Sequence, residues 1–210
     1  MGKYARGIQA ENEMLKQIED ILNRYLYSDF KIIQDVCYVS SSGKIAQIDA
    51  ILICNKGLFC IEFKSWNGTV KASLERTWIV YNGRFDVRYN NPVIQNSMHR
   101  ASIDALVHHK LPDLKNYFKS VIVFDNKANI VNEIYDSVQK KNIPLYSNVI
   151  HVDDFINLFY NKSDKTEIST QMQDDIYKFL LRLKEKYKPL FDKQQQGIIQ
   201  SWEGVSWNGK

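Results

Sequence analysis

The segment from Leu58 to Lys64 (LFCIEFK) constrains the fold most, because it is apolar on both sides of an expected β-strand. Successive side chains of a strand point to opposite faces, and here both alternating sets are apolar until Glu62 and Lys64. A strand that is apolar on both faces is central in its sheet and covered on each side. The segment therefore predicts an α/β protein in which Glu62 and Lys64 emerge at the end of a buried central strand.

Two more runs rich in β-branched and aromatic residues precede this strand, at Lys31–Val39 and Ile45–Cys54. The residues between the three runs, Ser40–Gly43 and Asn55–Gly57, favour turns, so we expect a three-stranded antiparallel meander. Further strands are expected at Thr77–Tyr81 and Arg84–Arg88, joined by a tight turn at Asn82-Gly83, and at Lys119–Phe124 and Asn148–Val152.

Helical periods account for most of the remaining chain. An apolar stripe from Ile8 to Tyr25 predicts an opening helix, and Glu11 is the charged residue that interrupts this stripe. Asn91 followed by Pro92 is typical of a helix start, and this helix should end near Lys110. We also expect a short helix from Asp153 or Asp154 to about Tyr160, and a longer helix whose core face runs from Ile168 to Tyr187 and which Pro189 bounds.

Composition sets the frame for function. The 210 residues suit one domain, expected over 1–190, followed by a C-terminal tail over 191–210 that carries Trp202 and Trp207. No apolar run approaches the length of a membrane span or a signal region, and Cys37, Cys54 and Cys60 lack metal-ligand spacing. We therefore expect a cytoplasmic protein with buried, reduced thiols and no membrane partner. The net charge of +4 permits a polyanionic partner without demanding one.

The acids on two neighbouring strands suggest a chemistry. Asp49 stands alone in the apolar run 47–53, and Glu62 and Lys64 end the next strand. Two carboxylates suit a divalent cation, which phosphodiester hydrolysis needs to neutralise the phosphate and to acidify water. Lys64 would orient the attacking water and offset developing charge, and Glu11 could add a third carboxylate directly or through water.

Whether Asp49 and Glu62 share a face depends on the turn between their strands. A two-residue turn at Asn55-Lys56 pairs Asp49 with Glu62, and one at Lys56-Gly57 pairs it with Lys64; both give a shared face. A three-residue loop does not, and would require a bulge between Ile48 and Leu52.

Five short motifs in order resemble the nuclease-related domain (NERD) family. They are Gly7-x-x-Ala10-Glu11, Gln47-Ile48-Asp49, the segment 62–68 (EFKSWNG), Trp78, and Asn91-Pro92-x-x-Gln95. The resemblance covers about residues 5–110. It departs from the family pattern at Ala10, at Ser65 and before Asp49, but at no charged group that the chemistry requires.

The resemblance implies a PD-(D/E)xK nuclease with a restriction-endonuclease-like fold, a mixed sheet flanked by helices. It implies that Asp49 and Glu62 bind Mg²⁺ or Mn²⁺, that Lys64 is the catalytic lysine, and that Glu11 and Gln95 support the active site, with Glu11 as a further metal ligand. The expected substrate is nucleic acid, with DNA preferred. The oligomeric state stays open, with a homodimer among the alternatives.

Simpler interpretations compete with each assignment. Glu62 and Lys64 could form an ordinary ion pair at a strand end, and Glu11 could gain only from the helix dipole. Asp49 could be an acid near a turn that accepts hydrogen bonds from backbone donors, and Gln95 could be a solvated residue of the first helical turn. The four histidines are expected to be surface or packing residues, and Trp66 and Trp78 core residues. At the level of function, the alternatives are a non-catalytic nucleic-acid- or protein-binding module on the same fold, or a structural subunit.

Overall fold

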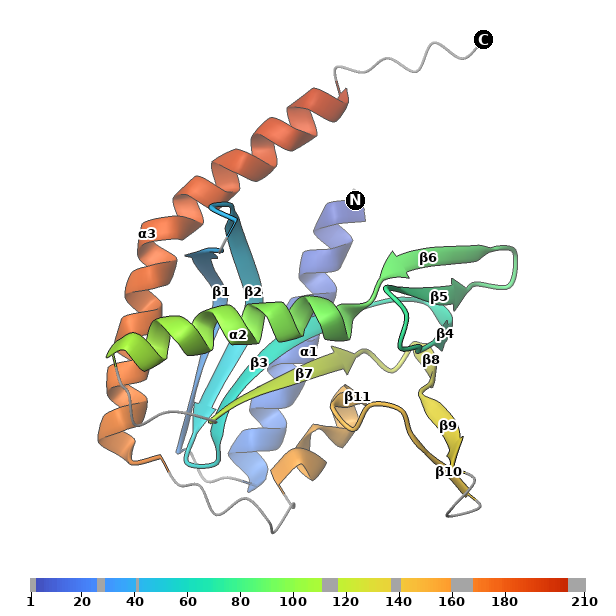
Figure 1. Ribbon diagram of the computed structural model, residues 1–210, viewed down its shortest axis with the longest axis horizontal. Helices are drawn as coiled ribbons and strands as arrows, with labels where there is room; N and C mark the ends of the chain where they lie inside the picture. The colour runs from blue at the N-terminus through green and yellow to red at the C-terminus, as the bar shows by residue number, and fades with distance from the viewer. Residues whose placement is uncertain are drawn as a thin grey trace.

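A five-stranded mixed sheet forms the centre of the protein in the computed structural model (Figure 1). The structure describes residues 3–25, 29–40, 42–110, 117–136, 141–159 and 168–203. The strand order is β1-β2-β3-β7-β11, where β1 to β3 are antiparallel and β7 and β11 run parallel to β3. The bounds are β1 (Phe30–Val39), β2 (Ile45–Cys54), β3 (Gly57–Lys64), β7 (Phe118–Phe124) and β11 (Val149–His151).

Helices cover both faces of this sheet, as the two-sided apolar pattern of β3 requires. On one face, α1 (Lys3–Tyr25) and the 3₁₀ helix η2 (Val152–Phe159) pack over one set of alternating strand residues. On the other face, α2 (Pro92–Lys110) and α3 (Thr170–Glu203) pack over the complementary set. The arrangement is the restriction-endonuclease-like mixed sheet flanked by helices that the sequence predicts. Among the described helices, none combines the length and apolar character needed to cross a membrane.

A second, four-stranded sheet extends from one end of the central sheet, at the right in Figure 1. Its order is β6-β5-β4-β8, with bounds β4 (Gly68–Lys71), β5 (Thr77–Tyr81), β6 (Asp86–Asn90) and β8 (Ala128–Val131). Trp78 is fully buried in its core, with Trp66 packed against the same cluster, so both tryptophans are core residues as predicted. The strands β9 (Glu133–Asp136) and β10 (Lys141–Pro144) form a separate two-stranded ribbon.

The meander is confirmed, and its register decides between the turn alternatives. Cys54 pairs with Gly57, so the two-residue turn is Asn55-Lys56. The ladder ends at the pair Ala50–Ile61, and the next residues along the same register are Asp49 and Glu62. Gly57 has a φ of +126°, and a Cβ there would lie 2.7 Å from the carbonyl oxygen of Tyr117. A side chain at this position would therefore clash with the chain that leads into β7.

Three local predictions are wrong. Tyr81 pairs with Asp86, so the hairpin loop is the four residues 82–85 and β6 begins later than expected. The Asn82 side chain accepts hydrogen bonds from the backbone N–H groups of Arg84 and Phe85, and these bonds stabilise the wider turn. The short helix is a 3₁₀ helix that starts at Val152.

Pro189 does not end the last helix, since α3 continues to Glu203. Proline removes one backbone donor, but Pro189 is exposed, so water can solvate the carbonyl that loses this donor. The helix thus runs across the predicted boundary at residue 190. Trp207 lies outside the described residues.

The sheet alternation is interrupted where Asp35 and Asp49 face each other. In β2, Ile51 and Ile53 pack with the α2/α3 core, yet Ile48 packs with the same core although its spacing predicts the opposite face. In β1 the same shift occurs around Asp35, whose φ is +54°. The pairs on either side of this point keep a common register, so the irregularity is local to the two aspartates.

Candidate active site

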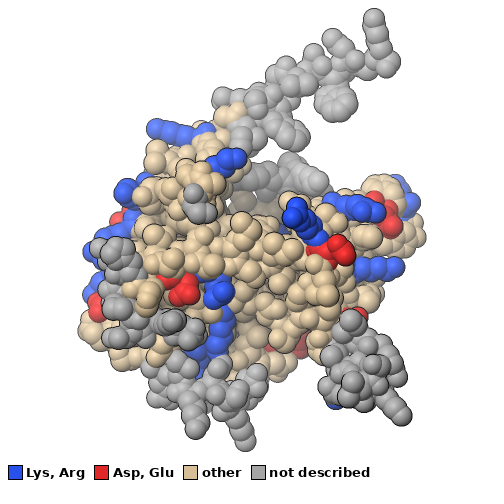
Figure 2. Space-filling model, viewed as in Figure 1, with Lys and Arg blue, Asp and Glu red and all other residues tan. Residues whose placement is uncertain are grey.

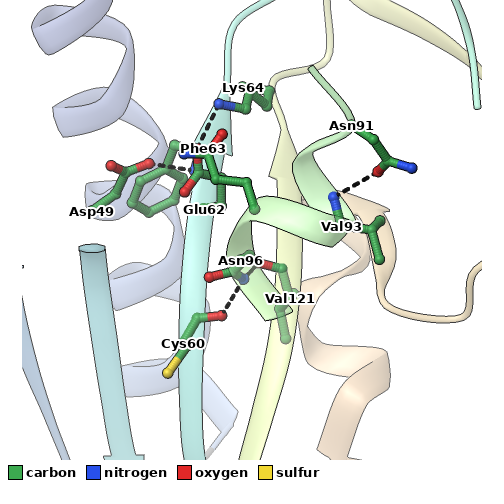
Figure 3. Close-up of polar contacts among 10 residues, drawn as sticks. Asp49, Cys60, Glu62, Phe63, Lys64, Asn91, Val93, Asn96 and Val121 are labelled. Carbon is green, nitrogen blue, oxygen red and sulfur yellow. Dashed lines mark hydrogen bonds and ion pairs between the residues drawn. The ribbon is translucent and has the colours of Figure 1, made fainter. Parts of the chain in front are cut away.

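Asp49 lies where β2 separates from β3. The ladder between the two strands ends at the pair Ala50–Ile61, and beyond it the Asp49 carboxylate accepts a 2.8 Å hydrogen bond from the backbone N–H of Phe63 (Figure 3). The side chain thus replaces the backbone acceptor that Phe63 would otherwise have. This contact fixes the Asp49 carboxylate beside the end of β3, next to Glu62.

Glu62 is almost fully buried, and its two carboxylate oxygens differ. Oε1 accepts hydrogen bonds from Lys64 Nζ at 2.6 Å and from Gln95 Nε2 at 2.9 Å. Oε2 is buried and has no hydrogen-bond partner. A buried carboxylate oxygen without a partner costs free energy, so its retention at a strand end indicates a ligand.

The neighbouring acids add to the negative charge. Burial raises the pKa of Asp49 well above its ordinary value, and the charges of Glu62 and Glu11 raise it further, against the opposing effects of Phe63 N–H and Lys64. Burial likewise raises the pKa of Glu11, with the charge of Asp35 next in importance. These carboxyl groups therefore resist ionising together, as expected where several acids are buried close to one another.

Asp49 and Glu11 line a pocket of about 640 Å³ between three helices, and Glu62 is buried next to its wall, beside Asp49 and Gln95. Glu11 on α1, Asp35 and Asp49 on the strands, and Gln95 on α2 all line this pocket. Residues of α3 close the remaining side; they are Lys188, Phe191 and Gln195. Hereafter we call this space the acidic pocket, because its described lining contains three carboxyl groups and one lysine.

The start of α2 positions Gln95. Asn91 Oδ1 accepts a 2.9 Å hydrogen bond from Val93 N and so caps the helix, as the Asn-Pro pair predicts. One turn later, the buried Asn96 donates to the carbonyl oxygens of Cys60 (2.8 Å) and Val121 (3.0 Å), which joins α2 to β3 and β7 (Figure 3). These contacts hold Gln95 against Glu62.

The donor set fits Mg²⁺ or Mn²⁺ with two protein carboxylates. Among the described residues, no group of three or more His, Cys, Asp or Glu side chains is placed to hold a metal ion. Mg²⁺ commonly uses one or two carboxylates and completes its shell with water and substrate phosphate. The free Oε2 of Glu62 and the mutual repulsion of the carboxyl groups around Asp49 match this requirement, whereas Glu11 is not part of a preformed three-carboxylate group among the described residues.

The sequence prediction thus places Asp49, Glu62, Lys64, Gln95 and Glu11 around one strand end, and the structure gathers them there. It also adds residues that the sequence analysis left aside. A lone acid in an apolar run is the pattern that singled out Asp49, and the same pattern at Asp35 would have found the second aspartate.

His99 is a titratable residue of the pocket lining to which the sequence analysis assigned no catalytic role. It follows Gln95 by one helical turn, and its Nδ1 hydrogen-bonds to the hydroxyl of Tyr38 at 2.9 Å. Burial lowers the pKa of His99, which favours the neutral ring. The contact agrees with the expected packing role.

The family model for the nuclease-related domain matches residues 6–125, which is more than half of the chain. This chain belongs to the nuclease-related domain (NERD) family. The match includes every strand of the meander, α1, α2 and β7, and therefore all of the residues that contact Glu62.

A curated relative is an uncharacterized protein of Bacillus anthracis. It is 25% identical over 171 residues, which cover 78% of this chain and 78% of the relative. The comparison with solved structures found no significant match. The family membership therefore supports a nuclease-related function and interaction with nucleic acid in general.

Proposed function

We propose that this protein is a metal-dependent nuclease that hydrolyses phosphodiester bonds, with DNA as the expected substrate. The observation that carries the proposal is the asymmetric environment of Glu62: one oxygen is fixed by Lys64 and Gln95, and the other is buried without a partner beside Asp49. This arrangement orients a carboxylate and leaves it free for one more ligand.

Asp49 and Glu62 would hold the cation. A bound Mg²⁺ would neutralise phosphate charge and lower the pKa of water. Glu11, which is half-buried on α1, would act through a water molecule rather than directly, since no three carboxylates converge in the described residues. Asp49 keeps its hydrogen bond to Phe63 N and so stays aligned.

Lys64 and Gln95 have distinct roles in this proposal. Lys64 Nζ lies 2.6 Å from Glu62 Oε1 and 5.8 Å from the centre of the Trp66 ring. These two contacts hold the lysine side chain beside the end of β3. There it would orient the attacking water and offset charge on the phosphate. Gln95 would keep Glu62 in the rotamer that leaves Oε2 without a protein partner, and is therefore a positioning residue.

Cleavage of plasmid and single-stranded DNA with Mg²⁺ tests the proposal. Glu62→Gln and Lys64→Ala should each reduce the cleavage rate by at least about 100-fold, because charge stabilisation and metal binding both depend on them. Glu75→Gln is the matched control, since it removes an exposed carboxylate and should leave the rate unchanged. Equal rates for wild type, Glu62→Gln and Lys64→Ala would contradict the proposal.

The second candidate is a binding module without activity. The short ion pair between Lys64 and Glu62 favours it, because a structural ion pair at a strand end has the same geometry. Binding of DNA with no cleavage under Mg²⁺ or Mn²⁺ would identify this alternative. For the nuclease we further propose a cytoplasmic location, in keeping with three buried free cysteines.

A further inference from the structure

The wall of the acidic pocket formed by α3 has no part in the family match. The match ends at residue 125, whereas Lys188, Phe191 and Gln195 lie on α3 and line the same pocket as Asp49 and Gln95. They are spaced by three and four residues, so they share one helix face. Lys188 directly precedes Pro189 and the other two residues follow it, in the part of α3 that extends beyond the end of the sheet (Figure 1).

Lys188 is the lysine of the described pocket lining, where it lies among carboxyl groups. Its Nζ contacts Asp192 Oδ1 at 2.6 Å, and the charge of Asp35 also acts on it. The contact with Asp192 orients the lysine along the helix. In Figure 2, Lys and Arg side chains gather along the edge formed by α3.

A phosphodiester needs positive charge to enter such a pocket. Glu11, Asp35 and Asp49 would repel a nucleic-acid backbone, and a divalent cation at Asp49 and Glu62 would attract the phosphate that is cleaved. The next phosphate along the strand needs a separate cation. Lys188 supplies one on the opposite wall, and the ring of Phe191 offers an apolar face for a base in the same wall.

The size of the pocket limits the form of the substrate. About 640 Å³ lies within the range of roughly 300–1,000 Å³ that is typical of pockets for small ligands, which is too small for a duplex. Helices α1, α2 and α3 bound this space on three sides. A base-paired nucleotide could enter this pocket only if it first left its partner strand and its stack, which costs free energy that an unpaired nucleotide does not lose.

We infer that the acidic pocket takes unpaired nucleic acid, a single strand or a frayed end, with Lys188 bound to a phosphate next to the cleaved one and Phe191 stacked on a base. This inference rests on the proposed nuclease function and names its substrate class. It assigns Lys188 and Phe191 a role in binding and none in the chemical step.

Binding and cleavage of one labelled DNA strand, compared with its blunt duplex, test the inference. Binding is measured by fluorescence anisotropy with the Glu62→Gln background, so that cleavage does not interfere. The single strand should bind at least about 10-fold more tightly than the duplex. Lys188→Ala in this background should weaken single-strand binding about threefold to tenfold and reduce the salt slope by about one.

Three matched variants separate the role of Lys188 from general charge and from folding. Lys193→Ala removes the same charge from an exposed position on the same helix, outside the pocket lining, and should leave affinity unchanged. Lys188→Arg keeps the charge and should restore binding. Phe191→Leu keeps apolar bulk without a ring, and should lower the preference for the single strand.

With Glu62 intact, Lys188→Ala should raise KM and leave kcat close to wild type. Equal binding of strand and duplex, or equal affinity of Lys188→Ala and Lys193→Ala, would overturn the inference even if the protein cleaves DNA. Conversely, absence of cleavage by wild type combined with Lys188-dependent binding of the single strand would reject the nuclease function and support the binding site.

Discussion

At the residue scale, the carboxyl groups at the end of β3 are placed to bind a ligand, and this placement lowers the stability of the folded protein. Asp49 is held by Phe63 N–H, and Glu62 leaves one oxygen without a partner. Clustered, buried carboxyl groups with raised pKa values occur at functional sites more often than in ordinary ion-pair networks. The stability of the metal-free protein should therefore increase when one charge is removed.

Asp49→Asn should stabilise the metal-free protein at neutral pH. Because burial and neighbouring acids raise the pKa of Asp49, the folded protein holds this proton more tightly than the unfolded chain does. The stability that this proton contributes is present below the ordinary aspartate pKa and is lost as the pH rises through the raised folded-state pKa. At neutral pH the carboxyl of the unfolded chain is charged, so folding must either bury that charge or take up a proton; asparagine avoids both costs, and its side-chain oxygen can still accept from Phe63 N–H.

Thermal unfolding in EDTA checks this prediction. We expect an increase in Tm on the order of 2–4 °C, the effect of about 1 kcal/mol in a domain of this size. The exposed Asp20, changed to Asn, serves as the control and should leave Tm unchanged. A lower Tm for Asp49→Asn would show that the charge at Asp49 stabilises the fold.

The three cysteines should not react with thiol reagents in the folded protein. Burial raises the pKa of Cys37 and Cys60 to about 12 and that of Cys54 to about 11, so each thiol stays protonated at neutral pH. Titration with a chromogenic disulfide reagent should detect the thiols only after the protein is denatured. Rapid reaction of one thiol in the native protein would contradict the buried positions.

At the element scale, the sequence predicts the strands of the central sheet and the β5–β6 hairpin, and it misses the short strands β4, β8, β9 and β10. The apolar runs of β2 and β3 and the capped start of α2 carry local signals, so their positions follow from pattern alone. In contrast, β4 has four residues and pairs with β8, about sixty positions away. Such pairing depends on tertiary contacts, which no local period records.

Gly68 is the residue on which the second sheet depends. Its φ is +115°, and a Cβ would lie 2.2 Å from the carbonyl oxygen of Tyr81 in the neighbouring strand. Gly68→Ala should lower the free energy of unfolding by about 3 kcal/mol, because it combines backbone strain with a clash against backbone atoms. Urea denaturation measures the change.

Gly83→Ala is the control for backbone strain alone. Gly83 has a φ of +88°, but nothing lies within 4 Å of its added Cβ. This variant should cost about 1 kcal/mol. Equal losses for the two variants would show that the contact with Tyr81 contributes nothing.

At the scale of the whole molecule, α3 has two roles: one part of it packs against the central sheet, and a later part lines the acidic pocket. Ile176 and Leu180 are fully buried against the central sheet, whereas Lys188 and Phe191 line the acidic pocket. The apolar period predicts the first part. It does not predict the second, because Pro189 is the usual mark of a helix end and only the exposed position of the proline permits continuation.

Truncation should separate these two roles. A chain that ends at residue 169 loses Ile176 and Leu180, so it should show no cooperative thermal transition. A chain that ends at Tyr187 keeps the buried face of α3 and should unfold cooperatively within about 5 °C of the full chain, but bind single-stranded DNA more weakly. Full binding by the chain ending at Tyr187 would remove α3 from the pocket's function.

The candidate site likewise combines residues that the sequence identifies with features that only the structure shows. Asp49, Glu62 and Lys64 could be assigned from sequence because they are the charged residues of two otherwise apolar strand runs and belong to motifs that resemble the family. The free oxygen of Glu62, the left-handed Asp35 and the wall contributed by α3 depend on side-chain contacts between elements far apart in the chain, and so required the structure.

The central claim is that Asp49 and Glu62 together hold one divalent cation. A crystal soaked with Mn²⁺ tests it most directly, since the anomalous signal of manganese locates the ion without knowledge of substrate. We predict one peak within coordination distance of Asp49 and of Oε2 of Glu62, and no peak there in Asp49→Asn crystals. An Mn²⁺-soaked wild-type crystal without that peak, with Glu62 still paired only to Lys64 and Gln95, would contradict the claim.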